Sequence, residues 1–232
     1  MAYILNIESS TNICSVCISK DGEMLSIREA STNSHASQMT VFIEQCLADL
    51  NIKITALSAV AISNGPGSYT SLRVGISTAK GICYGLGIPL IAVDTLTTMA
   101  MSAYELVKDE AAIYCPMIDA RRMEVYHSLF EIDGGVVKII EPMSPLVVDE
   151  LSFKRYYDAG KRLIFSGNGS SKCSSILPLE GSVFVGENCS SKNMIKLSTT
   201  KFEIKEFVDI AYHTPDYLKA PNITTPKNVI NT

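Results

Sequence analysis

The sequence predicts an α/β protein built from two similar halves, each of which opens with a three-stranded antiparallel meander. Runs of alternating apolar residues, separated by turn residues, predict the strands of these meanders. They lie at residues 3–8, 13–19 and 23–29 in the first half and at 113–118, 124–132 and 136–140 in the second. The recurrence indicates a duplicated unit with a degenerate second copy, although no sequence repeat supports it.

After its meander, the first half alternates helices with short apolar strands, an order typical of α/β folds. Apolar residues recur at spacings of three and four over residues 34–50 and again over 70–86, so we expect two amphipathic helices there. Short apolar runs at 57–62 and 89–93 predict buried strands, and a further helix is expected at 95–107. The first half is therefore expected to be a mixed sheet flanked by helices.

The second half is less regular after its meander. A short strand is predicted at 162–165, followed by a glycine-rich turn, and residues 193–205 have helical spacing. The stretch that follows contains three prolines and little periodicity. The sequence therefore predicts one domain at 1–107, a second domain at 108–219, and a tail at 220–232 to which no structure is assigned.

The composition is typical of a folded protein, because 47% of the 232 residues are hydrophobic and only 19% are charged. A formal net charge of -4 disfavours a protein that binds nucleic acid on its own. A signal peptide requires a basic segment before its apolar run, and no such segment precedes the first apolar run here. The apolar stretch at 76–93 is too broken by glycine, lysine and proline to span a membrane. We therefore expect a cytoplasmic protein without membrane contacts.

The sequence contains none of the common catalytic or phosphate-binding motifs. Gly65 and Gly67 match the first two places of a dinucleotide fingerprint, but Thr70 stands where the third glycine is needed. Neither the lysine of a P-loop nor the glycine of a nucleophile elbow follows at the required spacing. The three histidines form no zinc-binding motif. We therefore expect no catalytic residue, no metal site and no cofactor.

The stretch SNGPGSYTSLRVGIS places a glycine-rich corner between a predicted strand and a predicted helix. Gly65 and Gly67 permit backbone angles that other residues avoid, Pro66 restricts the angle between them, and Ser68 can cap the helix. Such a corner can hold an anion on free amide groups, or it can simply let the strand and helix pack closely. The spacing alone favours the structural corner.

The helix predicted at 70–86 carries polar residues opposite its apolar stripe and several glycines between the two. Each glycine inside a helix costs about 1 kcal/mol relative to alanine, so their repetition indicates that another backbone comes close, from the sheet beneath or from a partner helix. The outer faces of both helices are candidate partner-binding surfaces, with an ordinary solvated face as the alternative. Their residues are Val41, Ala48, Arg73, Ser77, Lys80 and Tyr84.

Several blocks of the sequence together resemble the bacterial TsaB family, also called YeaZ. These blocks are ILNIESSTNICSVCI, NGPGSYTSLRVGISTAKGI, DTLTTMA, DARRMEVY and PDYLK. The glycine block is the most specific of them, and the resemblance extends from the first strand to about Lys219. Members of this family take part in making N6-threonylcarbamoyladenosine in tRNAs that read codons beginning with adenine.

The resemblance implies a fold of the actin, sugar kinase and Hsp70 type (ASKHA), with two ribonuclease-H-like halves around a cleft. It also implies a non-catalytic relative of TsaD, the subunit that transfers the threonylcarbamoyl group. TsaD binds a metal through histidines on a helix of its first half, whereas the corresponding segment here, residues 34–50, offers only His35. Catalysis by this chain is therefore not expected.

The resemblance further implies the partners. TsaB pairs with TsaD through its two N-terminal helices, the pair recruits the ATPase TsaE, and free TsaB pairs with itself through the same surface. By this resemblance the segments at 34–50 and 70–86 form the interface, and the corner at 65–68 is structural. Contact with tRNA is expected only through the complex.

Relatives with this fold hold nucleotide phosphates in turns beside an acidic residue. The segment at 8–11 would fill the first of these turns, and the segment at 119–122, which carries two arginines and lacks paired glycines, would fill the second, so the resemblance implies a vestigial nucleotide cleft. Its residues would be Glu8, Ser9, Ser10, Asp119, Arg121, Gly167 and Gly169. Two alternatives to the partner role stay open: a nucleotide-binding sensor that uses this cleft, and a glycoprotease-like peptidase, for which the sequence offers neither a metal pair nor an activated nucleophile.

Overall fold

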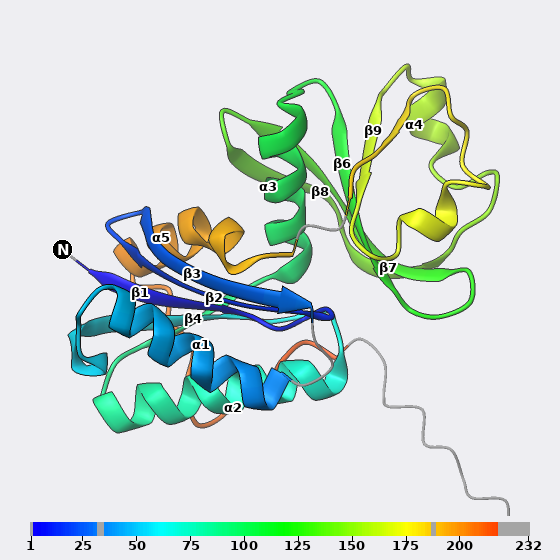
Figure 1. Cartoon of the computed structure of the whole chain (residues 1–232). Helices are drawn as coiled ribbons and strands as arrows, with labels where there is room; N and C mark the ends of the chain where they lie inside the picture. Colours follow the sequence, from blue (N-terminus) through cyan, green and yellow to red (C-terminus); the bar gives the residue numbers. More distant parts are fainter. Residues whose placement is uncertain (1, 32–34, 187–188, 218–232) are drawn as a thin grey trace, which may run out of the picture.

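The computed structural model describes residues 2–31, 35–186 and 189–217, and its chain forms two five-stranded mixed sheets (Figure 1). The first sheet has the order β3-β2-β1-β4-β5. β1, β2 and β3 form the antiparallel meander, and β4 and β5 add parallel strands beside β1. Its strands are β1 (Tyr3–Glu8), β2 (Ile13–Lys20), β3 (Glu23–Ser31), β4 (Leu57–Ser63) and β5 (Leu90–Val93). The tail predicted at 220–232 lies outside the described residues.

The second sheet repeats the topology of the first. Its order is β8-β7-β6-β9-β10, with the meander again antiparallel and the last two strands again parallel to the first. Its strands are β6 (Ile113–Asp119), β7 (Glu124–Asp133), β8 (Val136–Val147), β9 (Leu163–Ser166) and β10 (Ser182–Phe184). The shared order agrees with the two similar halves that the sequence predicts, and their duplication stays a prediction.

Helices flank both sheets. α1 (His35–Asp49) and α2 (Tyr69–Leu86) lie on one face of the first sheet, and α5 (Ile195–Glu203) lies on the opposite face (Figure 1). α3 (Thr95–Val107) packs against the second sheet. The remaining short helices are α4 (Lys154–Asp158) and the 3₁₀ helices η1 (Ile54–Ala56), η2 (Ser171–Cys173) and η3 (Ser191–Met194).

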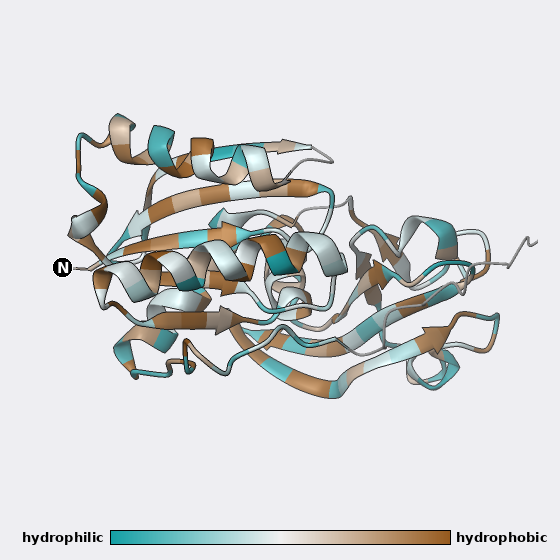
Figure 2. Ribbon diagram, turned by 90° about the horizontal axis from the view of Figure 1, so that it is seen from below, coloured by the Kyte–Doolittle hydropathy of each residue, from teal (hydrophilic) through white to brown (hydrophobic). Residues whose placement is uncertain are grey.

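The apolar stripes of α1 and α2 form the core of the first half, as their spacing predicts. The buried members of these stripes are Met39, Ile43, Cys46, Leu72, Ile76, Ala79 and Cys83. In Figure 2 the strands carry many of the hydrophobic residues, while the helices also carry hydrophilic ones. Because burying one Leu, Ile or Met side chain stabilises a fold by roughly 1.5–3 kcal/mol, the stripes determine which side of each helix stays outside.

Local signals set the ends of the helices that border the candidate site. Gly87 ends α2 in a left-handed conformation with φ 66°, where glycine is favoured. The carboxylate of Asp94 accepts a hydrogen bond from the Thr97 amide at 2.6 Å and so caps the start of α3. The predicted limits of α3 agree with the structure, and α2 begins one residue earlier than predicted.

Three features of the second half were not predicted. β8 continues past residue 140 to Val147 although it contains Pro142 and Pro145. It is an edge strand, where a missing amide donor is tolerated. α4 and β10 have five and three residues, which is too short for a periodic signal.

The chain after Ser190 returns to the first half. Met194 and Leu197 pack on the face of the first sheet opposite α1 and α2, and Val208 forms an isolated bridge with Leu90. The predicted division of the chain at residue 107 stays a prediction, although one sheet lies on each side of it. None of the helices in the described part of the chain is long and apolar enough to cross a membrane.

Candidate functional site

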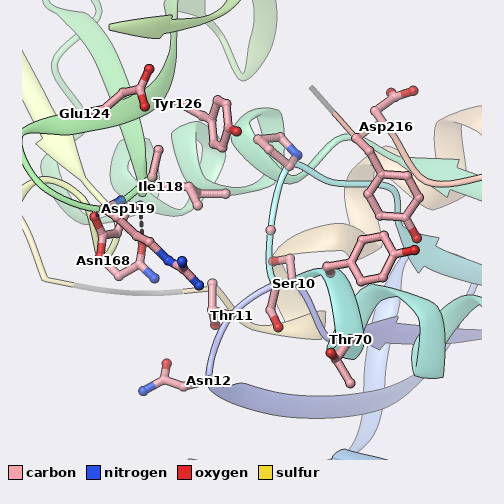
Figure 3. Close-up of a pocket in the computed structure, with 17 residues that line it drawn as sticks. Ser10, Thr11, Asn12, Thr70, Ile118, Asp119, Glu124, Tyr126, Asn168 and Asp216 are labelled. Atoms are coloured by element: carbon pink, nitrogen blue, oxygen red, sulfur yellow. Dashed lines mark hydrogen bonds between the residues drawn. The ribbon is translucent and has the colours of Figure 1, made fainter. Parts of the chain in front are cut away.

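A cleft of about 550 Å³ opens between the two halves, and both sheets contribute to its walls (Figure 3). The first half supplies the β1–β2 turn, with Ser10 at its start, and the corner that precedes α2. The second half supplies the end of β6 and the turn that follows it. Asp216 and Tyr217 complete the wall on the side of the first half.

The corner before α2 is held tightly against the β1–β2 turn. The Ser68 amide donates a hydrogen bond to the carbonyl of Ser10 at 2.7 Å. A Cβ atom added at Gly67 would lie 2.4 Å from that same oxygen. Gly65 has φ +102°, a conformation that favours glycine, and its peptide bond to Pro66 is cis. Because the Ser68 amide already has a backbone partner, this geometry supports the structural corner over the anion site.

The opposite wall carries a carboxylate, Asp119, whose negative charge is balanced by a neighbouring lysine. Asp119 donates its amide hydrogen to Asn168 Oδ1 at 2.9 Å (Figure 3). Its side chain accepts hydrogen bonds from the Arg121 amide and from the Lys172 ammonium. Burial raises the pKa of Asp119, but the hydrogen bonds from Lys172 and Arg121 outweigh it, so the pKa lies below its usual value. The Asp119 charge is therefore balanced within the second half.

The structure brings only part of the predicted nucleotide cleft together. Ser10, Asp119 and Arg121 line the cleft. Glu8 and Ser9 are fully buried and lie behind its wall.

The two predicted glycines in the turn after β9 pack against β6 instead of facing the cleft. A Cβ atom at Gly167 would lie 2.4 Å from the Met117 carbonyl oxygen, and one at Gly169 would lie 2.9 Å from the Ile118 carbonyl carbon. The residue between them, Asn168, faces the cleft. These glycines let the turn approach the strand closely, which is why the sequence needs them there.

Sequence reasoning missed several cleft residues, among them Asn12, Tyr126, Asp216 and Tyr217. Asp216 is held by the corner, since its amide donates to the Asn64 carbonyl at 2.8 Å and its carboxylate accepts from Asn64 Nδ2 at 2.7 Å. The Tyr217 ring lies 4.8 Å from the Tyr69 ring. The PDYLK block, which contains Asp216 and Tyr217, could have indicated these two residues. A motif so late in the chain is expected to pack against another segment.

Glu8 is a buried carboxyl group at the end of β1. Its Oε1 accepts a hydrogen bond from the Ser10 amide at 2.6 Å, and its Oε2 has no hydrogen-bond partner among the described residues. Burial raises the pKa of Glu8 above 4.5, against hydrogen bonds that lower it. Burial therefore makes the charged form of Glu8 less favourable in the folded chain than in the unfolded one.

We expect a Glu8→Gln variant to remove part of the pH dependence of stability. Because the folded-state pKa is raised, the stabilisation from Glu8 is fully present below the ordinary value of 4.5 and is lost as pH rises through the folded-state pKa. Relative to the variant, wild type should lose free energy of unfolding across that interval. Urea titrations at several pH values measure this difference. Parallel curves for the two proteins would contradict the assignment.

The candidate partner face lies on the outer sides of α1 and α2. Tyr84 is 85% exposed and Val41 is 44% exposed, both high values for large hydrophobic side chains. Ala48 and Ser77 are also exposed. Arg73 is exposed and its guanidinium lies 4.9 Å from the centre of the Tyr69 ring. A groove of about 440 Å³ runs along the first turns of α2, and Ala36 of α1 also lines it.

Lys80 differs from the other predicted contacts. It is half-buried, and its ammonium donates a hydrogen bond to the Ala211 carbonyl at 3.3 Å. It therefore ties α2 to the C-terminal segment in the isolated chain. Lys80 is a weaker candidate for a partner contact than Tyr84 for this reason.

The glycines of α2 serve two different neighbours. A Cβ atom at Gly75 would lie 2.3 Å from Ser9 Oγ, so this glycine lets the helix approach its own sheet. A Cβ atom at Gly81 or Gly85 would meet no described atom within 4 Å apart from its chain neighbours and the backbone of its own helix, so both face open space. The sheet therefore explains the first glycine but leaves the other two without a role in the isolated chain.

Comparison with known proteins identifies relatives that are similar over half of the chain or more. A protein of Escherichia coli named tRNA threonylcarbamoyladenosine biosynthesis protein TsaB is 27% identical over 222 residues, which is 93% of this chain and 94% of that protein. The protein of the same name from Haemophilus influenzae is 36% identical over 125 residues, 54% of this chain and 52% of that protein. A family model described as TsaD, tRNA N6-adenosine threonylcarbamoyltransferase, matches residues 27–229. The chain belongs to the TsaB branch of the TsaD family.

Solved structures agree with this assignment at the level of fold. YeaZ from Pseudomonas aeruginosa superposes with a TM-score of 0.82 at 23% identity, covering 94% of this chain and all of that one. An inorganic polyphosphate/ATP-glucomannokinase from Arthrobacter has a TM-score of 0.50 at 11% identity and covers 88% of this chain. The TsaB branch therefore shares its architecture with a sugar kinase, which confirms the predicted ASKHA fold.

Proposed function

We propose that this chain is a non-catalytic partner and activator of a TsaD-type enzyme in the biosynthesis of threonylcarbamoyladenosine in tRNA. The observation that carries the proposal is the outer face of α2, where Tyr84 stands exposed close to Gly81 and Gly85. Small residues let a partner helix approach closely, and an exposed aromatic ring supplies a contact of the kind that dominates interface energies. The name of the TsaB relatives supports the pathway.

The relation to TsaD supports a paired arrangement of two similar chains. Chains of one fold can pack through equivalent surfaces about a twofold or pseudo-twofold axis. The face of α1 and α2 would then meet the same helices of TsaD, or those of a second copy of this chain when TsaD is missing. The pair would recruit TsaE in the cytoplasm, and tRNA would be bound by the complex.

The side chains of the cleft are compatible with an activator's role. The described residues that line it include neither histidine nor cysteine, and Asp119 is engaged by Lys172. In the described part of the chain, no three His, Cys, Asp or Glu side chains lie where they could hold a metal ion. An activator needs none of these groups, because it acts by stabilising the active form of its partner.

The proposal is tested by rescue of depleted cells. Nucleoside mass spectrometry of tRNA should show threonylcarbamoyladenosine falling on depletion and returning with wild type but not with Tyr84→Asp. The aspartate would place a charge in the contact, whereas it costs the isolated chain little because Tyr84 is 85% exposed.

Leu179→Asp is the matched control, since Leu179 is 79% exposed and lies in the second half. It should restore the modification as wild type does. Modification that persists after depletion would refute the pathway, and rescue by Tyr84→Asp would remove this face from the interface.

One observation favours a second candidate, a nucleotide-binding sensor. The cleft is large enough for a nucleotide, and Arg121 is among its lining residues, as are Ser10 and Thr11 of the β1–β2 turn. Calorimetric titration of the chain with ATP and ADP distinguishes this function. Saturable binding that weakens in Arg121→Gln would support the sensor function. No binding heat at millimolar nucleotide would exclude it and leave the partner role as the only candidate.

A further inference from the structure

A second pocket lies in the second half, between the β7–β8 hairpin and α4. Its volume is about 400 Å³, and it shares no lining residue with the cleft. Its wall combines a buried histidine, an ion pair and apolar side chains. The candidate partner face on α1 and α2 belongs to the other half of the molecule, so neither the cleft nor the partner role accounts for this pocket.

The histidine of this pocket presents a fixed hydrogen-bond acceptor. His127 is only 4% exposed, and its Nδ1 lies 3.1 Å from the Ser144 carbonyl oxygen. A carbonyl oxygen can only accept, so Nδ1 carries the hydrogen and Nε2 carries the lone pair. Burial lowers the pKa of His127, against the Ser144 hydrogen bond and the nearby Glu141 charge, which raise it. The neutral ring therefore offers Nε2 to a donor.

An ion pair supplies both signs of charge to the same pocket. Glu141 accepts hydrogen bonds from the Arg155 guanidinium and from the Tyr156 hydroxyl. Every hydrogen bond that Arg155 makes within the described chain uses Nη2, which leaves the other edge of its fork for a ligand. The Arg155 side chain is 70% exposed and the Glu141 side chain 28% exposed, so both remain accessible.

The apolar wall is built around a residue in an unfavourable conformation. Phe153 has φ 64°, in the left-handed region that a bulky side chain rarely adopts. Its ring lies 5.6 Å from the His127 ring and 5.6 Å from the Phe165 ring. Leu146 and Leu151 continue this wall. Backbone strain of this kind is concentrated at functional sites, where the surrounding structure holds it in place.

We propose that this pocket binds a free α-amino acid with an apolar side chain. The ammonium group would donate to His127 Nε2 and to Glu141, and the carboxylate would accept from Arg155. The side chain would pack against Phe153 and Leu146. A wholly apolar ligand would leave the ion pair unused, and a purely anionic one would meet Glu141 and the His127 lone pair, which both disfavour it. The inference goes beyond the proposed function and does not depend on it.

Calorimetric titration of the full chain tests the proposal, with L-leucine as the first probe. Leucine amide lacks the carboxylate and resembles a peptide N-terminus, while N-acetyl-leucine lacks the ammonium and resembles a peptide C-terminus. We expect saturable binding of leucine, and at least tenfold weaker binding of each derivative. Equal affinity for either derivative would overturn the zwitterion assignment, and no saturable heat with leucine up to on the order of 10 mM would overturn the site.

Variants locate the binding. Arg155→Met keeps an apolar stem at an exposed position, and His127→Phe keeps an aromatic ring and removes the acceptor. Each should weaken leucine binding at least tenfold, while Lys161→Met, an exposed cation outside this pocket, should bind as wild type does. Circular dichroism confirms that each variant is folded. Unchanged affinity in a folded Arg155→Met variant would refute the role of the ion pair.

Discussion

A Gly67→Ala variant is expected to unfold at a much lower urea concentration than wild type. A methyl group at this position would lie 2.4 Å from the Ser10 carbonyl oxygen, 2.7 Å from its Cβ and 2.8 Å from its Cα. Ser10 cannot retreat easily, because it is buried and its amide is bonded to Glu8. The loss should be about 3 kcal/mol in free energy of unfolding, the upper part of the usual range for overpacking.

Gly85→Ala is the control for this result. Gly85 lies in α2, and among the described residues a Cβ there would meet nothing within 4 Å except its chain neighbours and its own helix backbone. Alanine there should leave the free energy of unfolding unchanged or raise it by about 0.5–1 kcal/mol, because alanine loses less entropy in a helix. Urea unfolding followed by circular dichroism measures both variants. Equal urea midpoints for Gly67→Ala and wild type would show that the corner before α2 does not pack tightly against the β1–β2 turn.

The fold was predictable where the sequence pattern is long and regular. α1 and α2 carry apolar stripes over four or more turns, which predicts helices. The meander strands alternate apolar and polar residues and are bounded by turn residues, which predicts strands. β8 shows where such reasoning fails. Pro142 and Pro145 argue against a strand, and only the position of β8 at the sheet edge makes them tolerable. An edge position is a tertiary property that local sequence does not carry.

The sites were less predictable than the fold. Glu8 looks like a cleft residue because it ends β1, yet its side chain turns into the interior. His127 and Arg155 gave no signal, since 28 residues separate them along the chain and only the hairpin and α4 bring them to one pocket. Spacing along a helix or strand predicts which residues share a face. It does not predict which elements meet across a pocket.

A Gly81→Leu variant separates the two roles of α2, because it should strengthen the isolated chain and weaken its pairing. Gly81 lies inside the helix with open space around it, so leucine should raise the free energy of unfolding by about 0.5–1 kcal/mol through helix propensity alone. The same side chain would hold a partner helix away from α2. Binding to the TsaD protein of the same organism should weaken at least tenfold, which is about 1.4 kcal/mol.

Thr200→Leu on α5 is the matched control, since Thr200 is exposed in a helix on the opposite face of the first sheet. It also replaces a poor helix former with a good one, so it should stabilise the chain without affecting pairing. For each variant, titration calorimetry gives the affinity for TsaD, and urea unfolding gives the free energy of unfolding of the isolated chain. A structural role for Gly81 would move both quantities in the same direction, whereas an interface role moves them in opposite directions. Unchanged pairing in Gly81→Leu would therefore exclude close helix packing on this face, however stable the variant proves to be.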